Sequence, residues 1–75
     1  MGISYRKLWM KLAEKEMKRT DLKDVVGISS NTLAKLGKNE YVSLEILERI
    51  GRYMQCDIGN IVEINNSDSL KENDA

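Results

Sequence analysis

Side chains that can bind nucleic acid recur at helical spacing in one short segment of the chain. A helix that begins after Ser29 would carry four residues, three or four positions apart, on one outward stripe: Asn31, Ala34, Lys35 and Lys38. The amide of Asn31 can bond in two places to adenine, the ammonium of Lys35 can donate to guanine, and the methyl group of Ala34 can pack on thymine. The stripe therefore indicates a surface with the chemistry to read base pairs.

Local roles compete with this interpretation. Ser29 is a natural N-cap, because its side-chain oxygen can accept a backbone N–H of the first helical turn, and capping is its simpler role. Asn31 lies in the first turn and has a similar local option. Ser30 and Thr32 can donate either to a base edge or to a phosphate. The roles of these residues therefore depend on the fold that presents them.

The composition argues against an enzyme or a metal site. The chain has no His and a single Cys, Cys56, so the His and Cys ligands of a zinc-type site and the commonest acid–base side chain are missing. Glu45 and Glu48 are typical of surface carboxylates, and 75 residues leave little room for a deep pocket. We therefore expect no catalytic residue, no cofactor and no metal, and we expect Cys56 to be a small buried hydrophobic side chain.

The sequence predicts a cytoplasmic protein with no membrane partner. No apolar run approaches the roughly 18 residues that suggest a transmembrane helix, and the N-terminal residues lack the apolar stretch of a signal peptide. A single cysteine cannot form an internal disulfide, which fits a reducing compartment.

Charge is divided unevenly along the chain although the net charge is zero. Residues 1–39 hold nine Lys or Arg and four Asp or Glu, whereas residues 40–75 hold three and eight. Such asymmetry is a hint of an electrostatic partner. The alternative is a solvated helical surface with a casual imbalance.

Apolar periodicity predicts an all-α fold of five helices. Stripes at helical spacing cover about residues 4–17, 19–26 and 44–54, and Ser4 and Ser43 are placed to be N-caps. In the second stripe the buried edge is expected to include three residues: Leu22, Val25 and Val26. On the first stripe, the only Trp is expected to be a core residue.

The remaining two helices are shorter. The third begins after Ser29, and its end is left open between Gly37 and Asn39, since either can take the left-handed conformation. Asp57 would cap a brief fifth helix that contains three apolar residues: Ile58, Ile61 and Val62. An alternative is a short strand made by residues 62–64 beside Ile3.

These elements define one domain over residues 1–64. Residues 65–75 contain a single large apolar residue, so we expect them to be a disordered polar tail.

Two short helices joined by a glycine turn occupy Arg19 to Lys38. The residues that must close over a small core are Leu22, Val26, Ile28, Leu33 and Leu36, with Gly27 at the turn. This spacing resembles the helix-turn-helix of the Cro/cI phage-repressor (XRE) family, and the likeness extends over residues 4–63. The chain departs from the family at Lys23, where a small residue is usual, and at Lys18-Arg19, where the family often has Thr-Gln.

The resemblance implies a five-helix lambda-repressor-like domain that binds double-stranded DNA sequence-specifically as a transcriptional regulator, in the first place a repressor. In the family, the third helix lies in the major groove and the second spans the phosphate backbone. The residues that would contact DNA here are Lys18, Arg19, Ser29, Ser30, Asn31, Thr32, Lys35, Lys38 and Asn39. Because such proteins usually pair on two-fold related sites, the resemblance also implies a homodimer, encoded by a bacterium or a phage.

Within that arrangement, the phosphate contacts come from both sides of the reading helix. Lys18 and Arg19 stand at the start of the second helix, where backbone N–H groups also favour phosphate. Lys38 and Asn39 would meet the backbone from the other side. The alternative for the basic side chains is solubilising charge.

A different function on the same fold is a protein-interaction module, such as an antitoxin or an anti-repressor with a protein partner. The acidic C-terminal half favours this alternative, and fold alone does not settle function. Candidate dimer surfaces are the fourth helix, its junction with Asp57, and the segment 62–64.

Overall fold

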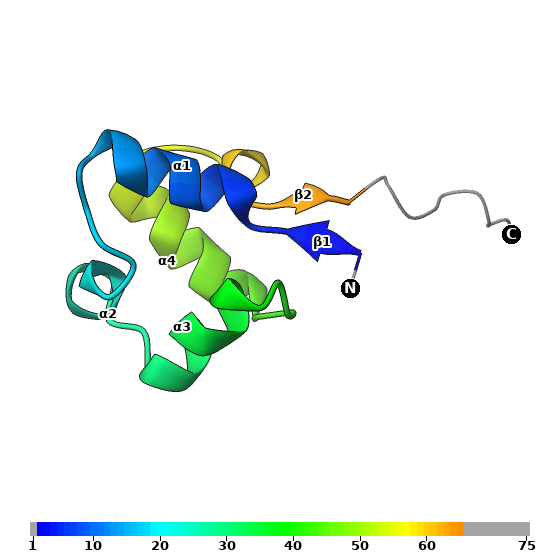
Figure 1. Cartoon of the computed structure of the whole chain (residues 1–75), viewed down its shortest axis with the longest axis horizontal. Coiled ribbons are helices and arrows are strands. Elements are labelled where there is room, and N and C mark those ends of the chain that lie inside the picture. The colour runs from blue at the N-terminus through cyan, green and yellow to red at the C-terminus, as the bar shows by residue number, and fades with distance from the viewer. Residues whose placement is uncertain (1, 66–75) are drawn as a thin grey trace, which may run out of the picture.

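The helices of the molecule surround a small apolar core, and a two-stranded ribbon projects from one end (Figure 1). The structure is a computed structural model, and it describes residues 2–65. Along the chain the elements are β1 (Ile3–Ser4), α1 (Arg6–Glu14), α2 (Asp21–Val25), α3 (Ser30–Gly37), α4 (Leu44–Met54), the 3-10 turn η1 (Ile58–Asn60) and β2 (Glu63–Ile64). The tail expected to be disordered lies, apart from Asn65, outside the described residues.

The first helix is shorter than predicted at both ends. α1 begins after Tyr5 rather than at residue 4, because Ser4 is part of β1. The N-cap position is therefore Tyr5, although the Ser4 hydroxyl still accepts the backbone N–H of Arg6 at 3.1 Å. The helix ends before Glu16, which takes a left-handed conformation with φ of 58°. Long-range strand pairing thus overrides the local cap signal.

The second and third helices form the predicted pair. α2 is confined to five residues, and Val25 is 42% exposed instead of buried, so that expectation was wrong. α3 begins after Ser29, whose Oγ accepts the backbone N–H of Thr32 at 3.1 Å. Gly37 is the last helical residue, and Asn39 takes the left-handed conformation with φ of 59°.

The fourth helix begins and ends where the sequence predicts, whereas the fifth helix does not form as an α-helix. Ser43 caps α4 by accepting the N–H of Ile46 at 3.2 Å. The five-helix expectation is corrected to four α-helices and one 3-10 turn among the described residues. At the start of η1, the Asn60 side chain accepts the N–H of the N-cap residue Asp57 at 3.2 Å. The chain must then extend to pair with β1, so there is no length for a further turn.

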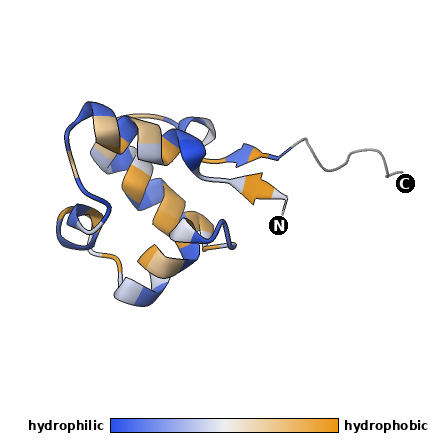
Figure 2. Ribbon diagram, viewed as in Figure 1, coloured by the Kyte–Doolittle hydropathy of each residue, from blue (hydrophilic) through white to orange (hydrophobic). Residues whose placement is uncertain are grey.

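The core is built from one inward face of each helix. Its buried members are Tyr5, Leu8, Leu12, Leu22, Ile28, Leu36, Leu47, Ile50, Met54 and Ile61. Val26 and Leu33 are half-buried against it, which confirms that the five apolar residues predicted to close the helix-turn-helix do so. Every helix mixes hydrophobic and hydrophilic residues (Figure 2), as helices with one buried face must. Trp9 is half-buried at the edge of this core.

The strand alternative is confirmed in a shorter form. Ile3 pairs with Ile64 and Ser4 with Glu63 in antiparallel register, while Val62 stays outside the strand. The Glu63 carboxylate lies 3.1 Å from Nη2 of Arg6 and 3.8 Å from Nζ of Lys7, and it so ties β2 to the start of α1. Within residues 2–65, no helix has the length and apolar character needed to cross a membrane.

Candidate nucleic-acid interface

The outward stripe predicted on the third helix exists. Asn31, Ala34, Lys35 and Lys38 are all exposed, and we refer to these four residues as the α3 stripe. On the opposite side of the helix, Leu36 is fully buried and Leu33 is half-buried. α3 is therefore held by one apolar face and offers a polar and basic face to a partner.

The start of α3 is closed by its own side chains. The Ser29 hydroxyl accepts the backbone N–H of Thr32 at 3.1 Å and donates to Oγ1 of Thr32, also at 3.1 Å. Thr32 is half-buried, whereas Ser30 is exposed. The structure thus gives Ser29 and Thr32 a capping role, and it leaves Ser30 as the freer hydroxyl at this end of the helix.

The end of α3 is fastened to the start of α1. Oδ1 of Asn39 accepts the backbone N–H of Tyr5 at 3.1 Å, and the Tyr5 hydroxyl donates to the carbonyl oxygen of Glu40 at 2.8 Å. Tyr5 is 1% exposed, and this burial raises the pKa of its phenol. Asn39, a predicted DNA contact, therefore has a structural bond through its oxygen, which leaves its NH2 group as the donor it can offer to DNA.

The turn between α2 and α3 is supported by α4. Gly27 has a φ of 81°, a conformation that L side chains rarely adopt, and no atom lies within 4 Å of the place where its Cβ would stand. Nη1 of Arg49 approaches the Gly27 carbonyl oxygen at 3.4 Å, and Nη2 of Arg49 bonds to Glu45 at 3.3 Å. The Arg49 side chain thus connects α4 to the turn that precedes α3.

Lys18 and Arg19 both lie in the loop just before α2 and are exposed. The backbone N–H of Lys18 donates to the Asp21 carboxylate at 2.9 Å, which fixes the loop to the first turn of α2. The guanidinium of Arg19 lies over the ring of Trp9, 4.0 Å from its centroid. On its other side, Nη1 of Arg19 is 3.7 Å from the point where a Cβ on Gly37 would stand, so this cation has reached the last turn of α3.

Sequence reasoning missed this contact because it treated Trp9 as a core residue only. The single Trp of the chain at the edge of an apolar stripe, with an Arg in the loop that follows the helix, is the signal that was available.

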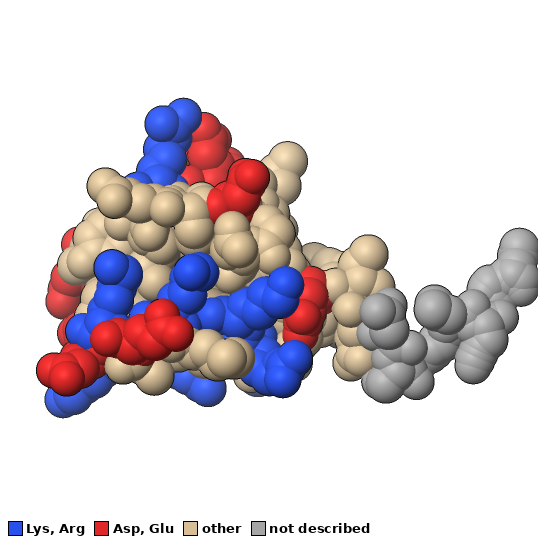
Figure 3. Space-filling view, turned by 90° about the horizontal axis from the view of Figure 1, so that it is seen from above, with Lys and Arg blue, Asp and Glu red and all other residues tan. Residues whose placement is uncertain are grey.

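The cations of the helix-turn-helix form no ion pair with an acidic side chain among residues 2–65. They are Lys18, Arg19, Lys23, Lys35 and Lys38. The ion pairs found among residues 2–65 all lie elsewhere and join Arg6 to Glu63, Lys7 to Glu63, Arg49 to Glu45 and Arg52 to Glu48. Acidic side chains also lie among the basic ones on the face seen in Figure 3. Among residues 2–65, the cations around α2 and α3 thus form no ion pair, and neither do Lys11 and Lys15 of the α1 region, so they are available to an anionic partner.

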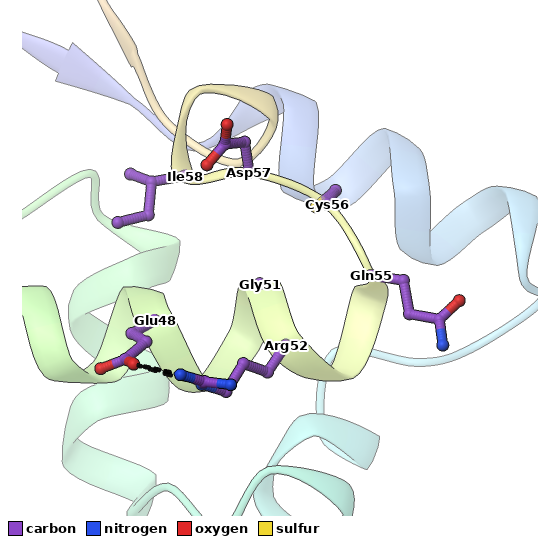
Figure 4. Close-up of a pocket in the computed structure, with 7 residues that line it drawn as sticks. All are labelled: Glu48, Gly51, Arg52, Gln55, Cys56, Asp57 and Ile58. Atoms are coloured by element: carbon purple, nitrogen blue, oxygen red, sulfur yellow. Dashed lines mark hydrogen bonds and ion pairs between the residues drawn. The ribbon is translucent and has the colours of Figure 1, made fainter.

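A separate hollow of about 490 Å³ lies between α4 and η1 (Figure 4). Its lining residues are Glu48, Gly51, Arg52, Gln55, Cys56, Asp57 and Ile58. The Glu48–Arg52 ion pair lies along α4, and the half-buried Cys56 lies on the segment that crosses to η1. The lining residues are all outside the helix-turn-helix, so the hollow is distinct from the candidate interface.

Comparisons with known proteins agree with this geometry. The family model for the Cro/C1-type HTH DNA-binding domain matches residues 7–67. The crystal structure of the transcriptional regulator VanUg is similar to this chain with a TM-score of 0.79 and 50% sequence identity, over 83% of each chain. A search of curated proteins found no match.

Proposed function

The chain belongs to the Cro/C1-type family of helix-turn-helix DNA-binding domains, and we propose that it is a sequence-specific transcriptional repressor that reads duplex DNA with α3. The observation that carries the proposal is the exposed α3 stripe, surrounded by cations that have no acidic partner among the described residues. The 50% identity to VanUg, which is described as a transcriptional regulator, supports a regulatory role.

In this proposal α3 lies in the major groove and divides its contacts by chemistry. Asn31 bonds to adenine, Lys35 donates to guanine, and Ala34 packs on a thymine methyl group. Lys18 and Lys38, at the two ends of the motif, bind backbone phosphates and set the register without reading sequence. Repression follows from occupancy, because a bound domain excludes other proteins from the same stretch of DNA.

A homodimer fits this mode of reading. One α3 covers only a few base pairs, and two copies on two-fold related half-sites about one helical turn apart would double the contact. The surfaces available for pairing lie away from α3: the hollow between α4 and η1, and β2, where Ile64 is 73% exposed.

The deciding experiment is selection of bound DNA from a random pool, followed by affinity measurements at several salt concentrations. We expect one enriched motif and an affinity that falls steeply with salt, with a log–log slope of about −0.9 for each neutralised phosphate. Asn31→Ala and Lys35→Ala should change which motif is preferred. Lys38→Ala should weaken binding to all sequences alike and should reduce the magnitude of the salt slope by about 0.9, because one phosphate contact is lost. Lys15→Ala, an exposed lysine outside the motif, is the matched control and should change neither property.

The competing function makes the opposite prediction. A protein-interaction module, such as an antitoxin or an anti-repressor, would bind duplex DNA weakly and enrich no motif. That result would overturn the proposal and direct attention to a protein partner. Unchanged binding of an Asn31→Ala/Lys35→Ala double variant to the selected site would instead show that the wrong face had been chosen.

A further inference from the structure

Arg19 and Trp9 form a contact that goes beyond the α3 stripe. Resting on the proposed DNA binding, we propose that Trp9 is a positioning residue for a phosphate contact: its indole ring holds the Arg19 guanidinium beside the last turn of α3, ready for a backbone phosphate. The guanidinium lies 4.0 Å from the ring centroid, within the range of a cation–π contact. Trp9 is in turn half-buried against the core, so the ring is itself fixed.

Arg19 differs from the other arginines in its partners. Arg6, Arg49 and Arg52 each bond to a glutamate. Arg19 has neither a carboxylate nor a hydrogen-bond acceptor for its side chain among residues 2–65, and its contact there is the Trp9 ring. Stacking uses the flat face of a guanidinium and leaves the N–H donors at its rim. Those donors match two phosphate oxygens at once, so the side chain is fixed in place and still able to bind.

The location of the guanidinium suits a phosphate beside the bases that α3 would read. Nη1 of Arg19 is 3.7 Å from where a Cβ on Gly37 would stand, and the next residue is Lys38 of the α3 stripe. The contact therefore joins three elements: α1 supplies the ring, the loop before α2 supplies the cation, and the cation lies beside Gly37 at the end of α3. Because Trp9 orders this long side chain before DNA arrives, binding should lose less conformational entropy.

The alternative is that the stack only fastens the loop to the helical body. Both roles allow Trp9 variants to lower stability, so stability cannot separate them. They differ in the salt dependence of the Arg19→Ala variant. If Arg19 binds a phosphate, its loss reduces the salt slope; if the stack only fastens the loop, the slope stays that of the wild type. In addition, if Trp9 acts through Arg19, replacing the ring has no effect on DNA affinity once Arg19 is gone.

The test measures binding of the full chain to a mixed-sequence duplex of about two helical turns, over a series of salt concentrations. Four variants are compared with the wild type: Trp9→Leu, Trp9→Phe, Arg19→Ala, and the double variant Trp9→Leu/Arg19→Ala. Arg6→Ala is the matched control, because Arg6 is exposed and already paired with Glu63. Thermal unfolding followed by circular dichroism establishes the temperature at which all variants are folded.

We expect Arg19→Ala to weaken binding and to reduce the salt slope by about 0.9, as the loss of one phosphate contact does. Trp9→Leu should weaken binding about two- to five-fold, the range of an exposed cation–π contact, and should keep the wild-type salt slope because the cation is still present. The affinity of Trp9→Phe should lie between those of the wild type and Trp9→Leu. In the Arg19→Ala background, Trp9→Leu should have no further effect. Arg6→Ala should match the wild type.

Two results would overturn the inference. One is a wild-type salt slope for Arg19→Ala, whatever the affinity of that variant; the other is an equal loss from Trp9→Leu with and without Arg19. Should Trp9→Leu fail to fold, the fluorescence emission of the single Trp, measured in the wild type and in Arg19→Ala, tests the inference instead. DNA should change the Trp9 emission in the wild type and change it much less in Arg19→Ala, and equal changes would contradict the inference.

Failure of this inference can be told apart from failure of the proposed function. If the wild-type chain shows no salt-dependent affinity for duplex DNA, the proposed function fails and the inference falls with it. If Asn31→Ala and Lys35→Ala shift the selected motif but Trp9 and Arg19 show no coupling, the inference fails alone.

Discussion

The hydrogen bond between the Tyr5 hydroxyl and the Glu40 carbonyl oxygen should contribute measurably to stability. Its length is 2.8 Å, and Tyr5 is 1% exposed, so water has little access to the hydroxyl. Tyr5→Phe keeps the ring packing and removes this donor alone. We expect the free energy of unfolding to fall by about 1 kcal/mol, the typical net value of such a bond, and Tm to fall by about 4–8 °C for a domain of this size.

The same residue gives this prediction a dependence on pH. Burial raises the pKa of the Tyr5 phenol above its ordinary value of 10.0, so the folded state holds this proton more tightly than the unfolded state does. The stabilisation is therefore complete below about pH 10 and is lost as the pH rises through the raised pKa. The difference in stability between wild type and Tyr5→Phe should shrink over that alkaline range.

Urea unfolding followed by circular dichroism, at neutral pH and at steps above about pH 10, measures both effects. Tyr41→Phe is the matched control, because Tyr41 is 63% exposed and removing its hydroxyl should change the free energy of unfolding little. A Tyr5→Phe variant as stable as the wild type at neutral pH would refute the proposed anchoring of α1 to the end of α3. A difference that stays constant at alkaline pH would refute the role of burial.

Two glycines and one capping serine give further predictions. Gly51→Ala would place a Cβ 2.9 Å from the carbonyl oxygen of Cys56, so we expect a loss of about 1–3 kcal/mol in urea unfolding; Gly59→Ala, with nothing within 4 Å, is the control, and equal losses would contradict the clash. Gly27→Ala forces a side chain into a φ of 81° and should lower the unfolding free energy by about 1–2 kcal/mol, with an unchanged Tm as the contrary result. Ser43→Ala removes the cap of α4 and should lower stability by about 1 kcal/mol in the same urea assay, unless water replaces the cap and the variant matches the wild type.

The helices were predictable where local signals act alone. α4 has a capping serine at Ser43 and a clear apolar stripe, and its bounds agree with the prediction. α1 was predicted to begin too early, because the pairing of Ser4 with Glu63 depends on residues almost a whole chain apart, and to end too late, because Glu16 takes a left-handed conformation. η1 replaced the expected fifth helix for the same reason, since β2 must reach β1. Long-range pairing is invisible to periodicity, which compares only near neighbours.

In the candidate interface, too, features set by local sequence were predictable and features set by long-range contacts were not. The exposure of the α3 stripe followed from helical spacing, and Ser29 was rightly expected to cap. The bond from Tyr5 to Asn39 spans 34 residues, and the stack of Arg19 on Trp9 depends on the path of a loop. Neither could be read from residue types alone, because each depends on how α1 is placed against the helix-turn-helix. That Asn31 and Lys35 bind bases remains a prediction.

The ribbon of β1 and β2 has a practical consequence for anyone who wishes to modify this protein. The N–H of Asn65 donates to the carbonyl oxygen of Gly2 at 2.7 Å, so the two ends of the described segment leave side by side. They do so at the other end of the molecule from α2 (Figure 1). A fluorescent label or a second domain attached at Gly2 or at Asn65 would depart from the same point, and a short linker that joins these two residues would close residues 2–65 into a ring without disturbing the helices.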